Sequence, residues 1–535
     1  RKATGVGAGL YLTFRTQDQE SVTAKVGLSY TSVENARLNR ETEAATLSFD
    51  EAREISRQTW EEYLGRIRVE TPAREDKVKF YTGLYHALLG RGLASDVNGA
   101  YPRNDGSVGQ IPLKDGKPVH NLYNTDAAWG AQWNLTQVWA LAYPEYYSDY
   151  ISSHLLVYKD AGWLDGIANS RYVSGVGTNL LSTIIAGAYQ CGIRDFDVNT
   201  AYEACLKNEL DGENRPLGAG KIDTRYFVEY GYVPHLDKGD GPDEAFMFSA
   251  SHTLEYAYSA WAVAQWAKQL GKTDDYNRLM DLSKGWERIY DPSCNFVRPK
   301  KKDGTFIEDF NPMQVWRGFQ EGNAWQYTFY VPHDAKGLVA KVGADVFNHR
   351  LDSIFTVSRK LIFSGGTEVG AFAGLQTLYN QGNQPCLHIS WMFNEAGRPS
   401  LTQKWVRAIL NEFYGTDGIH GYGYGQDEDQ GQLGAWYVIS SLGLFDMKGL
   451  TDQAPSFALG SPLFDKITIR LNDRYYKGKE FVIETRNNSK QNDYVQSMDL
   501  NGKPLTDTRI PFSEIVQGGH LVLEMGNQPK DRYEN

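Results

Sequence analysis

Residues 254–270 read LEYAYSAWAVAQWAKQL, and this stretch decides the fold class. Its apolar side chains cover one broad helical face, and Gly271 follows as a helix stop. Residues 77–92, KVKFYTGLYHALLGRG, repeat the pattern, and Thr273 before two aspartates predicts the start of a further helix. Similar segments, joined by long Gly/Asn/Asp-rich loops, fill the middle of the chain. We therefore predict a mainly α fold with a helical barrel over 73–447.

Both ends of the chain alternate polar and apolar residues, which is the period of a β-strand. Residues 7–47 predict strands, and because about forty residues cannot close a sandwich alone, we assign 1–47 to the C-terminal part of a β-sandwich domain. Residues 48–72 predict a linker helix with an acidic first turn. Residues 448–535, with an Asn-Gly turn at 501–502, predict a β-rich segment packed on the barrel.

Composition narrows the classes of function. The chain has 535 residues and a net charge of −11, and its longest basic stretch is the short PKKKDG, so nucleic acid and anionic membranes are poor partners. No run of eighteen apolar residues predicts a membrane span. The four cysteines show no CxxC spacing, and they do not indicate a compartment. The aromatic content of 13% moderately favours carbohydrate, because aromatic faces stack on sugar rings.

Residues 421–436, GYGYGQDEDQGQLGAW, contain a carboxylate cluster in a glycine-rich approach to an apolar segment. Asp427, Glu428 and Asp429 repel one another, which raises their pKa values and disfavours such clustering unless it has a use. The alternative is that one aspartate merely caps the following helix. Since one carboxylate would suffice for a cap, the cluster favours a polar site.

A second candidate is EGNAWQYTFYVPHD, residues 321–334. Glu321 precedes a block of aromatic residues, and a carboxyl surrounded by aromatic surface stays protonated near neutrality, as a general acid requires. Asn323 and Trp325 follow it as candidate substrate contacts. The alternative is a first-turn helix acid beside core aromatics. Together with Asp427 and Asp429, Glu321 fits the pair of one protonated and one ionised carboxyl that glycoside hydrolysis needs.

Two further segments offer polar and aromatic groups. In NQGNQPCLHISWMFN (380–394), the amide oxygens of Asn383 and Gln384 suit calcium, and His388 or Trp391 suits a sugar face. The alternative there is a polar loop with a satisfied core histidine.

In NTDAAWGAQWNLTQ (124–137), Trp133, Asn134 and Gln137 offer stacking and hydrogen bonds, although packing on a helical face explains the tryptophan equally well. Motifs for nucleotide binding, GxSxG hydrolases, HExxH zinc enzymes and EF-hands are missing from the sequence.

Taken together, these segments resemble glycoside hydrolase family 92, whose members are calcium-dependent exo-acting α-mannosidases that invert anomeric configuration. The resemblance covers most of the chain. It rests on the following stretches: VGLSYTSVENARLN (26–39), EGNAWQYTFYVPHD (321–334), GNQP (382–385), LTQKWVRAIL (401–410), QDEDQGQLGAWYV (426–438) and LGSPLF (459–464).

The resemblance implies an (α/α)6 barrel preceded by a β-sandwich, an oligosaccharide substrate, and a periplasmic or secreted location. By this likeness Glu321 is the general acid, and Asp427 and Asp429 activate the attacking water. The loop at 382–388, with Asn383 and Gln384, would lie near the calcium that holds the terminal sugar.

Three positions depart from the family pattern. Gln384 stands where members commonly have Glu, Asn134 where many have Asp, and Gln137 where Arg is usual. Each removes charge from the expected sugar pocket. Two alternatives to an α-mannosidase therefore stay open: a related (α/α)6 glycosidase of shifted sugar specificity, and a catalytically silent glycan-binding protein.

Overall fold

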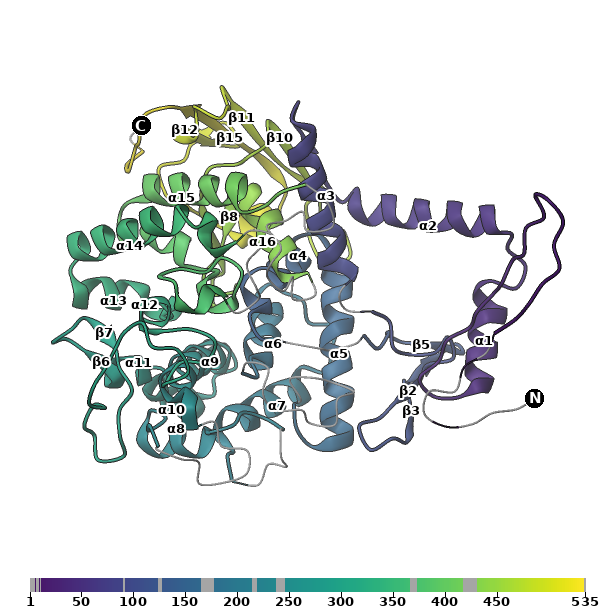
Figure 1. Cartoon of the computed structure of the whole chain (residues 1–535), viewed down its shortest axis with the longest axis horizontal. Helices are drawn as coiled ribbons and strands as arrows, with labels where there is room; N and C mark the ends of the chain where they lie inside the picture. The colour runs from purple at the N-terminus through teal and green to yellow at the C-terminus, as the bar shows by residue number, and fades with distance from the viewer. Residues whose placement is uncertain are drawn as a thin grey trace.

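The computed structural model describes residues 5, 9, 11–89, 92–123, 128–164, 178–213, 219–236, 246–365, 373–416 and 431–533. Helices dominate this part of the chain, and a mixed sheet follows them (Figure 1). None of the described helices is long and apolar enough to cross a membrane. The four cysteines are free thiols.

The helical body runs from α3 to α16. Its α-helices are α3 (Arg74–Leu89), α4 (Leu135–Ala142), α5 (Pro144–Ala161), α6 (Leu181–Gln190), α7 (Val198–Leu210), α8 (Thr224–Tyr230), α9 (Ser249–Gln269), α10 (Thr273–Leu282), α11 (Gly285–Ile289), α12 (Ala324–Tyr327), α13 (Ala335–Val342), α14 (Ala344–Arg359), α15 (Pro399–Glu412) and α16 (Gln432–Ser441). Short 3-10 turns that matter below are η3 (Pro332–Asp334), η6 (Gln384–Cys386) and η7 (Ile389–Asn394).

Helix α9 is buried from Ser249 to Ala267, and it packs against α6, α10 and α11. It ends where the sequence predicts, because Gly271 adopts the left-handed conformation with φ +69°. The next helix, α10, begins at Thr273 as expected. Among the described residues, one continuous core joins the helical body to the sheet.

The C-terminal sheet has the strand order β1-β10-β11-β15-β12-β13. Only the β11–β15 pair in it is parallel. The strands are β1 (Ile67–Glu70), β10 (Lys466–Arg470), β11 (Glu480–Arg486), β12 (Tyr494–Leu500), β13 (Lys503–Pro504) and β15 (Gly519–Gly526). The predicted Asn501-Gly502 turn joins β12 to β13, and both residues have positive φ, as such a hairpin requires. Figure 1 shows this sheet against α15 and α4 at one end of the helical body.

Shorter strands and one further helix accompany the helical body and the sheet. A three-stranded sheet pairs β14 (Arg509–Pro511), β9 (Ser456–Leu459) and β8 (Leu444–Phe445), and α17 (Phe512–Ile515) follows β14. The two-stranded pairs are β2 (Ala100–Pro102) with β3 (Val108–Gln110), β4 (Leu113–Lys114) with β5 (Lys117–Pro118), and β6 (Tyr290–Asp291) with β7 (Phe296–Val297).

The N-terminal region differs from the strands predicted for residues 7–47. Its described residues form no strand, and α1 (Val33–Glu43) begins after Ser32, whose hydroxyl accepts from the Asn35 amide. A strand needs a hydrogen-bonded neighbour, and the described chain offers none here. Apolar side chains such as Tyr11 and Leu28 are therefore exposed. The assignment of 1–47 to a sandwich domain stays a prediction.

The predicted linker helix is present as α2 (Phe49–Leu64), which begins with a capping box between Ser48 and Glu51. It buries no residue and projects away from the helical body (Figure 1). The range 48–72 is not helical throughout, because β1 pairs with β10 from the far end of the sequence. That strand pairing could not be read from a local pattern.

One polar cluster attaches the N-terminal segment to the rest. The buried carboxylate of Asp96 accepts hydrogen bonds from the Ser29 and Thr31 hydroxyls and, at 2.7 Å, from the Asn39 amide. Asn39 also binds the backbone of Val97 through its side-chain oxygen, at 3.0 Å. In Figure 1, α1 accordingly lies beside the hairpin of β2 and β3.

Candidate active site

Glu321 lies in a tight turn immediately before α12. Its backbone has φ +47°, a left-handed conformation that costs a residue with a side chain roughly 1–2 kcal/mol. Such strain persists only where the surroundings fix the backbone. In this turn, Glu321 is partly exposed and therefore accessible to solvent, whereas the residue before it, Gln320, is buried.

Asn323 stabilises the exit from this turn. Its side-chain oxygen accepts from the backbone amides of Trp325, at 2.9 Å, and Gln326, at 3.3 Å, which caps α12. Its amide nitrogen donates to the carbonyl oxygens of Leu375, at 2.7 Å, and Thr377, at 2.9 Å. The Asn323 side chain, predicted to contact substrate, is therefore buried, and both its oxygen and its nitrogen form hydrogen bonds with backbone groups.

The predicted calcium loop contacts the Glu321 turn directly. The Asn383 amide donates to the carbonyl oxygen of Glu321 at 2.8 Å, and its oxygen accepts from the Gln384 backbone at 3.1 Å. Gln384 and Gln432 in turn both lie against Gly130: a Cβ added to Gly130 would fall 2.4 Å from Gln384 Cγ and 2.7 Å from Gln432 Oε1. Three segments distant in sequence thus meet beside the candidate acid.

Asp427 and Asp429, the predicted bases, lie outside the described residues. The described chain resumes at Gly431, whose φ of +97° and close approach to α3 leave no room for a side chain, since a Cβ would meet His86 O at 2.4 Å. The Gln432 amide then donates to Trp129 O at 2.8 Å. The position of either aspartate relative to Glu321 stays a prediction.

The ligand types near Glu321 are compatible with calcium. Among the described residues, no group of three or more His, Cys, Asp or Glu side chains is arranged to hold a metal. Gln432 Oε1, however, is a buried oxygen without a hydrogen-bond partner in the described part of the chain, and it lies close to Gln384. Neutral amide oxygens are ligands that calcium accepts.

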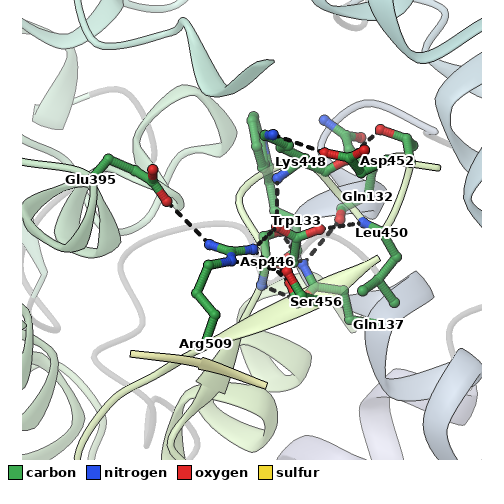
Figure 2. A network of polar contacts seen from close by, with 11 residues as sticks. Gln132, Trp133, Gln137, Glu395, Asp446, Lys448, Leu450, Asp452, Ser456 and Arg509 are labelled. Carbon is green, nitrogen blue, oxygen red and sulfur yellow. Dashed lines mark hydrogen bonds and ion pairs between the residues drawn. The ribbon is translucent and has the colours of Figure 1, made fainter. Parts of the chain in front are cut away.

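Trp133, Asn134 and Gln137 are fully buried around the start of α4. Asn134 caps that helix, because its side-chain oxygen accepts from the Leu135 amide at 2.6 Å. Gln137 forms two hydrogen bonds with the backbone of Asp446, 2.8 Å to its oxygen and 2.9 Å to its nitrogen. Figure 2 shows Trp133 and Gln137 within this polar network. The amides predicted to bind sugar here bind protein backbone.

His388 and Trp391 are buried as well. Trp133 stacks on His388 with ring centroids 4.4 Å apart, and His388 Nε2 donates to Phe329 O at 2.8 Å. Burial lowers the pKa of His388 to about 4, so its ring is neutral at pH 7. Trp391 stacks on Phe445 at 5.3 Å. These contacts match those of packing residues.

Trp325 is partly exposed, but its ring faces other partners. It meets Phe296 edge-on at 4.9 Å, and the Arg350 guanidinium lies 4.7 Å from its centre.

The predicted residues that the structure brings together are thus Glu321, Asn323, Asn383 and Gln384. Those that lie within the core or face elsewhere are Trp133, Asn134, Gln137, Trp325, His388 and Trp391.

The sequence analysis missed a buried acid near the turn. Glu255 on α9 is fully buried, and its carboxylate accepts from Trp129 Nε1 at 3.2 Å and from the Thr178 hydroxyl. The Tyr327 hydroxyl lies 3.4 Å from it and donates to Gln320 O at 2.8 Å. Burial raises the pKa of Glu255. The available signal was that Glu255 is the one acidic residue in the largely apolar 254–270 segment.

Comparison with known proteins identifies the family. The model of the glycosyl hydrolase family 92 catalytic domain matches residues 35–527. The chain belongs to this family.

Two solved structures from family 92 and one further glycosidase are similar to the chain. The family GH92 alpha-mannosidase BT3965 from Bacteroides thetaiotaomicron is 28% identical, with a TM-score of 0.80 over 94% of this chain and 62% of its own. The inverting mannosidase BT2199 from the same species is 26% identical, with a TM-score of 0.81 over 94% of this chain and 66% of its own.

An uncharacterized secreted glycosidase of Arthroderma benhamiae is 25% identical over 98% of this chain and 63% of its own length. The chain thus spans less than two thirds of the length of each of these three relatives. The resemblance found in the sequence motifs is confirmed at the level of the family.

Proposed function

We propose that the chain carries the catalytic site of an inverting exo-α-mannosidase that releases terminal mannose from α-mannosides such as N-glycans. Family membership supports a glycosidase. The two family 92 structures described above, at 28% and 26% identity, are named as an alpha-mannosidase and as an inverting mannosidase. The observation that carries the proposal is the turn at Glu321, whose strained backbone is held by a hydrogen bond from Asn383 of the predicted calcium loop.

Glu321 is the proposed general acid. A glycosidic oxygen leaves poorly without a proton, and a carboxyl group held in place beside the bond supplies it. The contacts to Gln320, Glu321 O and Asn323 hold the turn, so little backbone reorganisation is needed when the proton moves. Asp427 and Asp429 are the proposed bases that deprotonate water on the opposite face of the sugar ring.

The remaining parts of the site are proposed from the family. The helical body is proposed to be an (α/α)6 barrel. Calcium would be held through amide oxygens of Asn383 and Gln384, and when bound it would help to orient sugar hydroxyls. Because the Arthroderma relative is named a secreted protein, we also propose a secreted or periplasmic location.

The decisive experiment compares leaving groups. Glu321→Gln is expected to lower kcat on methyl or disaccharide α-mannosides by about 10²–10⁴-fold, the usual contribution of a general acid. With dinitrophenyl α-mannoside, which leaves without a proton, the loss is expected to be small. Asp427→Asn and Asp429→Asn are each expected to slow both substrates equally. NMR of the first-formed sugar should show β-mannose.

Glu412→Gln is the matched control, since Glu412 pairs with Arg359 on the surface and should leave both rates unchanged. Full activity of Glu321→Gln on the disaccharide would remove Glu321 from the mechanism. The same assay with EDTA tests calcium, and undiminished turnover would contradict its role.

The second candidate is a glycosidase of the same family with another sugar preference. The neutral side chain of Gln384 beside Gly130 and Gln432 favours it, because the family commonly has a carboxylate there. A panel of aryl α-glycosides separates the two proposals. Binding of mannosides without turnover of any member would instead indicate a glycan-binding protein.

A further inference from the structure

The first turns of α9 lie against the segment that ends at Glu321. The backbone amides of Ala250 and Ser251 both donate to Gly318 O at 2.9 Å. The Ser251 hydroxyl accepts from the Gln320 amide at 3.0 Å. The N-terminal end of this buried helix thus fixes the path of the chain as it approaches Glu321.

Side-chain contacts from Gln320 to His252 and from His252 to Asp223, called the relay below, continue this path into the core. His252 is fully buried on α9, and its Nδ1 lies 2.9 Å from Asp223 Oδ2, while its Nε2 lies 3.2 Å from Gln320 Oε1. Since a carboxylate only accepts, Nδ1 carries the proton and the ring orientation is fixed. An amide can present either its oxygen or its nitrogen to Nε2, so this contact is available to a neutral or a charged ring.

Three polar groups of Gln320 are engaged through these contacts: its backbone amide, its carbonyl oxygen and its side-chain oxygen. Its amide donates to Ser251, its carbonyl accepts from the Tyr327 hydroxyl at 2.8 Å, and its side chain meets His252. On the other side of Glu321, Asn383 holds the carbonyl oxygen. The left-handed backbone of Glu321 is therefore held from both sides, as a strained residue requires.

We propose that Asp223 and His252 are positioning residues for Glu321, acting through Gln320 to aim its carboxyl at the leaving oxygen. The inference rests on the proposed role of Glu321 as the general acid. Neither residue touches substrate in this scheme, since Asp223 and His252 are both buried. The relay sets the backbone of the proton donor, and misplacement of a catalytic group by about 1 Å can cost 10²-fold in rate.

The test uses His252→Phe, which keeps a planar ring between Phe248 and Tyr256 and removes both nitrogens. We expect kcat on a disaccharide α-mannoside to fall by about 10–100-fold with KM nearly unchanged. The rate on dinitrophenyl α-mannoside should stay within about threefold, because that leaving group needs no acid. Asp223→Ala should give a smaller loss with the same dependence on the leaving group.

His333→Phe is the matched control. His333 is also buried and donates through Nε2 to Ser283 O at 3.0 Å, so the variant loses a comparable contact away from the Glu321 turn. It should lower the Tm without changing the ratio of the two rates. Hydrogen exchange of the peptide over 318–323 gives a second readout, and His252→Phe should speed exchange at the Gln320 amide.

The outcomes separate the two proposals. If the rate loss of Glu321→Gln depends on the leaving group and that of His252→Phe does not, the positioning role of the relay is overturned and Glu321 remains the general acid. If Glu321→Gln shows no such dependence, both are overturned. Equal losses on both substrates in His252→Phe would assign His252 to fold stability alone and overturn its positioning role.

Discussion

His388 is a histidine without charge in the core of the helical body. Its ring stacks on Trp133, its Nε2 donates to the Phe329 carbonyl, and burial lowers its pKa from 6.5 to about 4. In the unfolded chain the ring binds a proton below about pH 6.5, whereas in the folded chain it does not until about pH 4. The fold therefore loses stability as the pH falls through this window.

His388→Gln is expected to flatten this pH dependence. The titration of His388 alone accounts for about 3 kcal/mol between neutral pH and pH 4, because the unfolded state binds one proton more. Urea unfolding at several pH values from 4.5 to 7.5 measures the slope. The variant loses stability at neutral pH through the lost contacts, but a slope equal to that of the unchanged protein would contradict the prediction.

The aromatic candidates show that a local sequence pattern does not tell whether an aromatic side chain contacts a sugar or packs in the core. Trp133, His388 and Trp391 were predicted as sugar contacts from polar-aromatic clustering. The alternatives were packing on a helical face for Trp133 and a satisfied core histidine for His388. A tryptophan that stacks on a sugar and one that stacks on a buried histidine have the same local sequence. Glu321 was chosen as the candidate acid because it stands in EGNAWQY, part of a long and specific motif, and its role stays a prediction. The His252 relay gave no such signal, because its partner Asp223 comes from another segment.

Among the elements, β1 shows how a short strand joins the two ends of the fold. Ile67 and Val69 are buried and pair with Ile469 and Ile467 of β10, while the alternating residues face solvent. The strand closes one edge of the C-terminal sheet directly before α3 begins.

Ile67→Ala is expected to lower the free energy of unfolding by about 2–5 kcal/mol, because it removes buried methyl groups and leaves a cavity. Glu70→Ala, on the exposed side of the same strand, should cost at most about 1 kcal/mol, since its ion pair with Lys466 is solvent-exposed. Urea unfolding compares the two. Similar losses would show that the burial of β1 contributes little.

Elements differed in how far the sequence predicted them. The helices α9 and α10 and the hairpin at Asn501-Gly502 follow from local spacing and turn residues, and they appear where expected. The strand β1 depends on a partner about 400 residues away, which no local pattern reveals. Conversely, alternation over 7–47 predicted strands that find no partner among the described residues.

In the whole molecule, few contacts among the described residues attach the N-terminal segment to the helical body. Helix α2 buries no residue, and the exposed apolar side chains of residues 11–33 rest on no core in the described chain. The cluster around Asp96 is a polar attachment between this segment and the rest.

Asp96→Ala is expected to release residues 29–39 without unfolding the body. The variant removes the acceptor for Ser29, Thr31 and Asn39, so proteolysis within this segment should speed several-fold while the main thermal transition stays in place. Mass spectrometry of timed trypsin digests locates the cut. Asp105→Ala on the nearby exposed hairpin serves as the comparison, and equal protection in both variants would contradict the prediction.

The hydrogen bond from Asn383 to the carbonyl of Glu321 has a practical consequence for redesign. It links the loop that would choose the monosaccharide to the group that would deliver the proton, so the two properties cannot be varied independently at position 383. Libraries aimed at a new glycoside should randomise Gln384 and hold Asn383 constant. Variants selected at 384 would then explore sugar preference on an undisturbed catalyst.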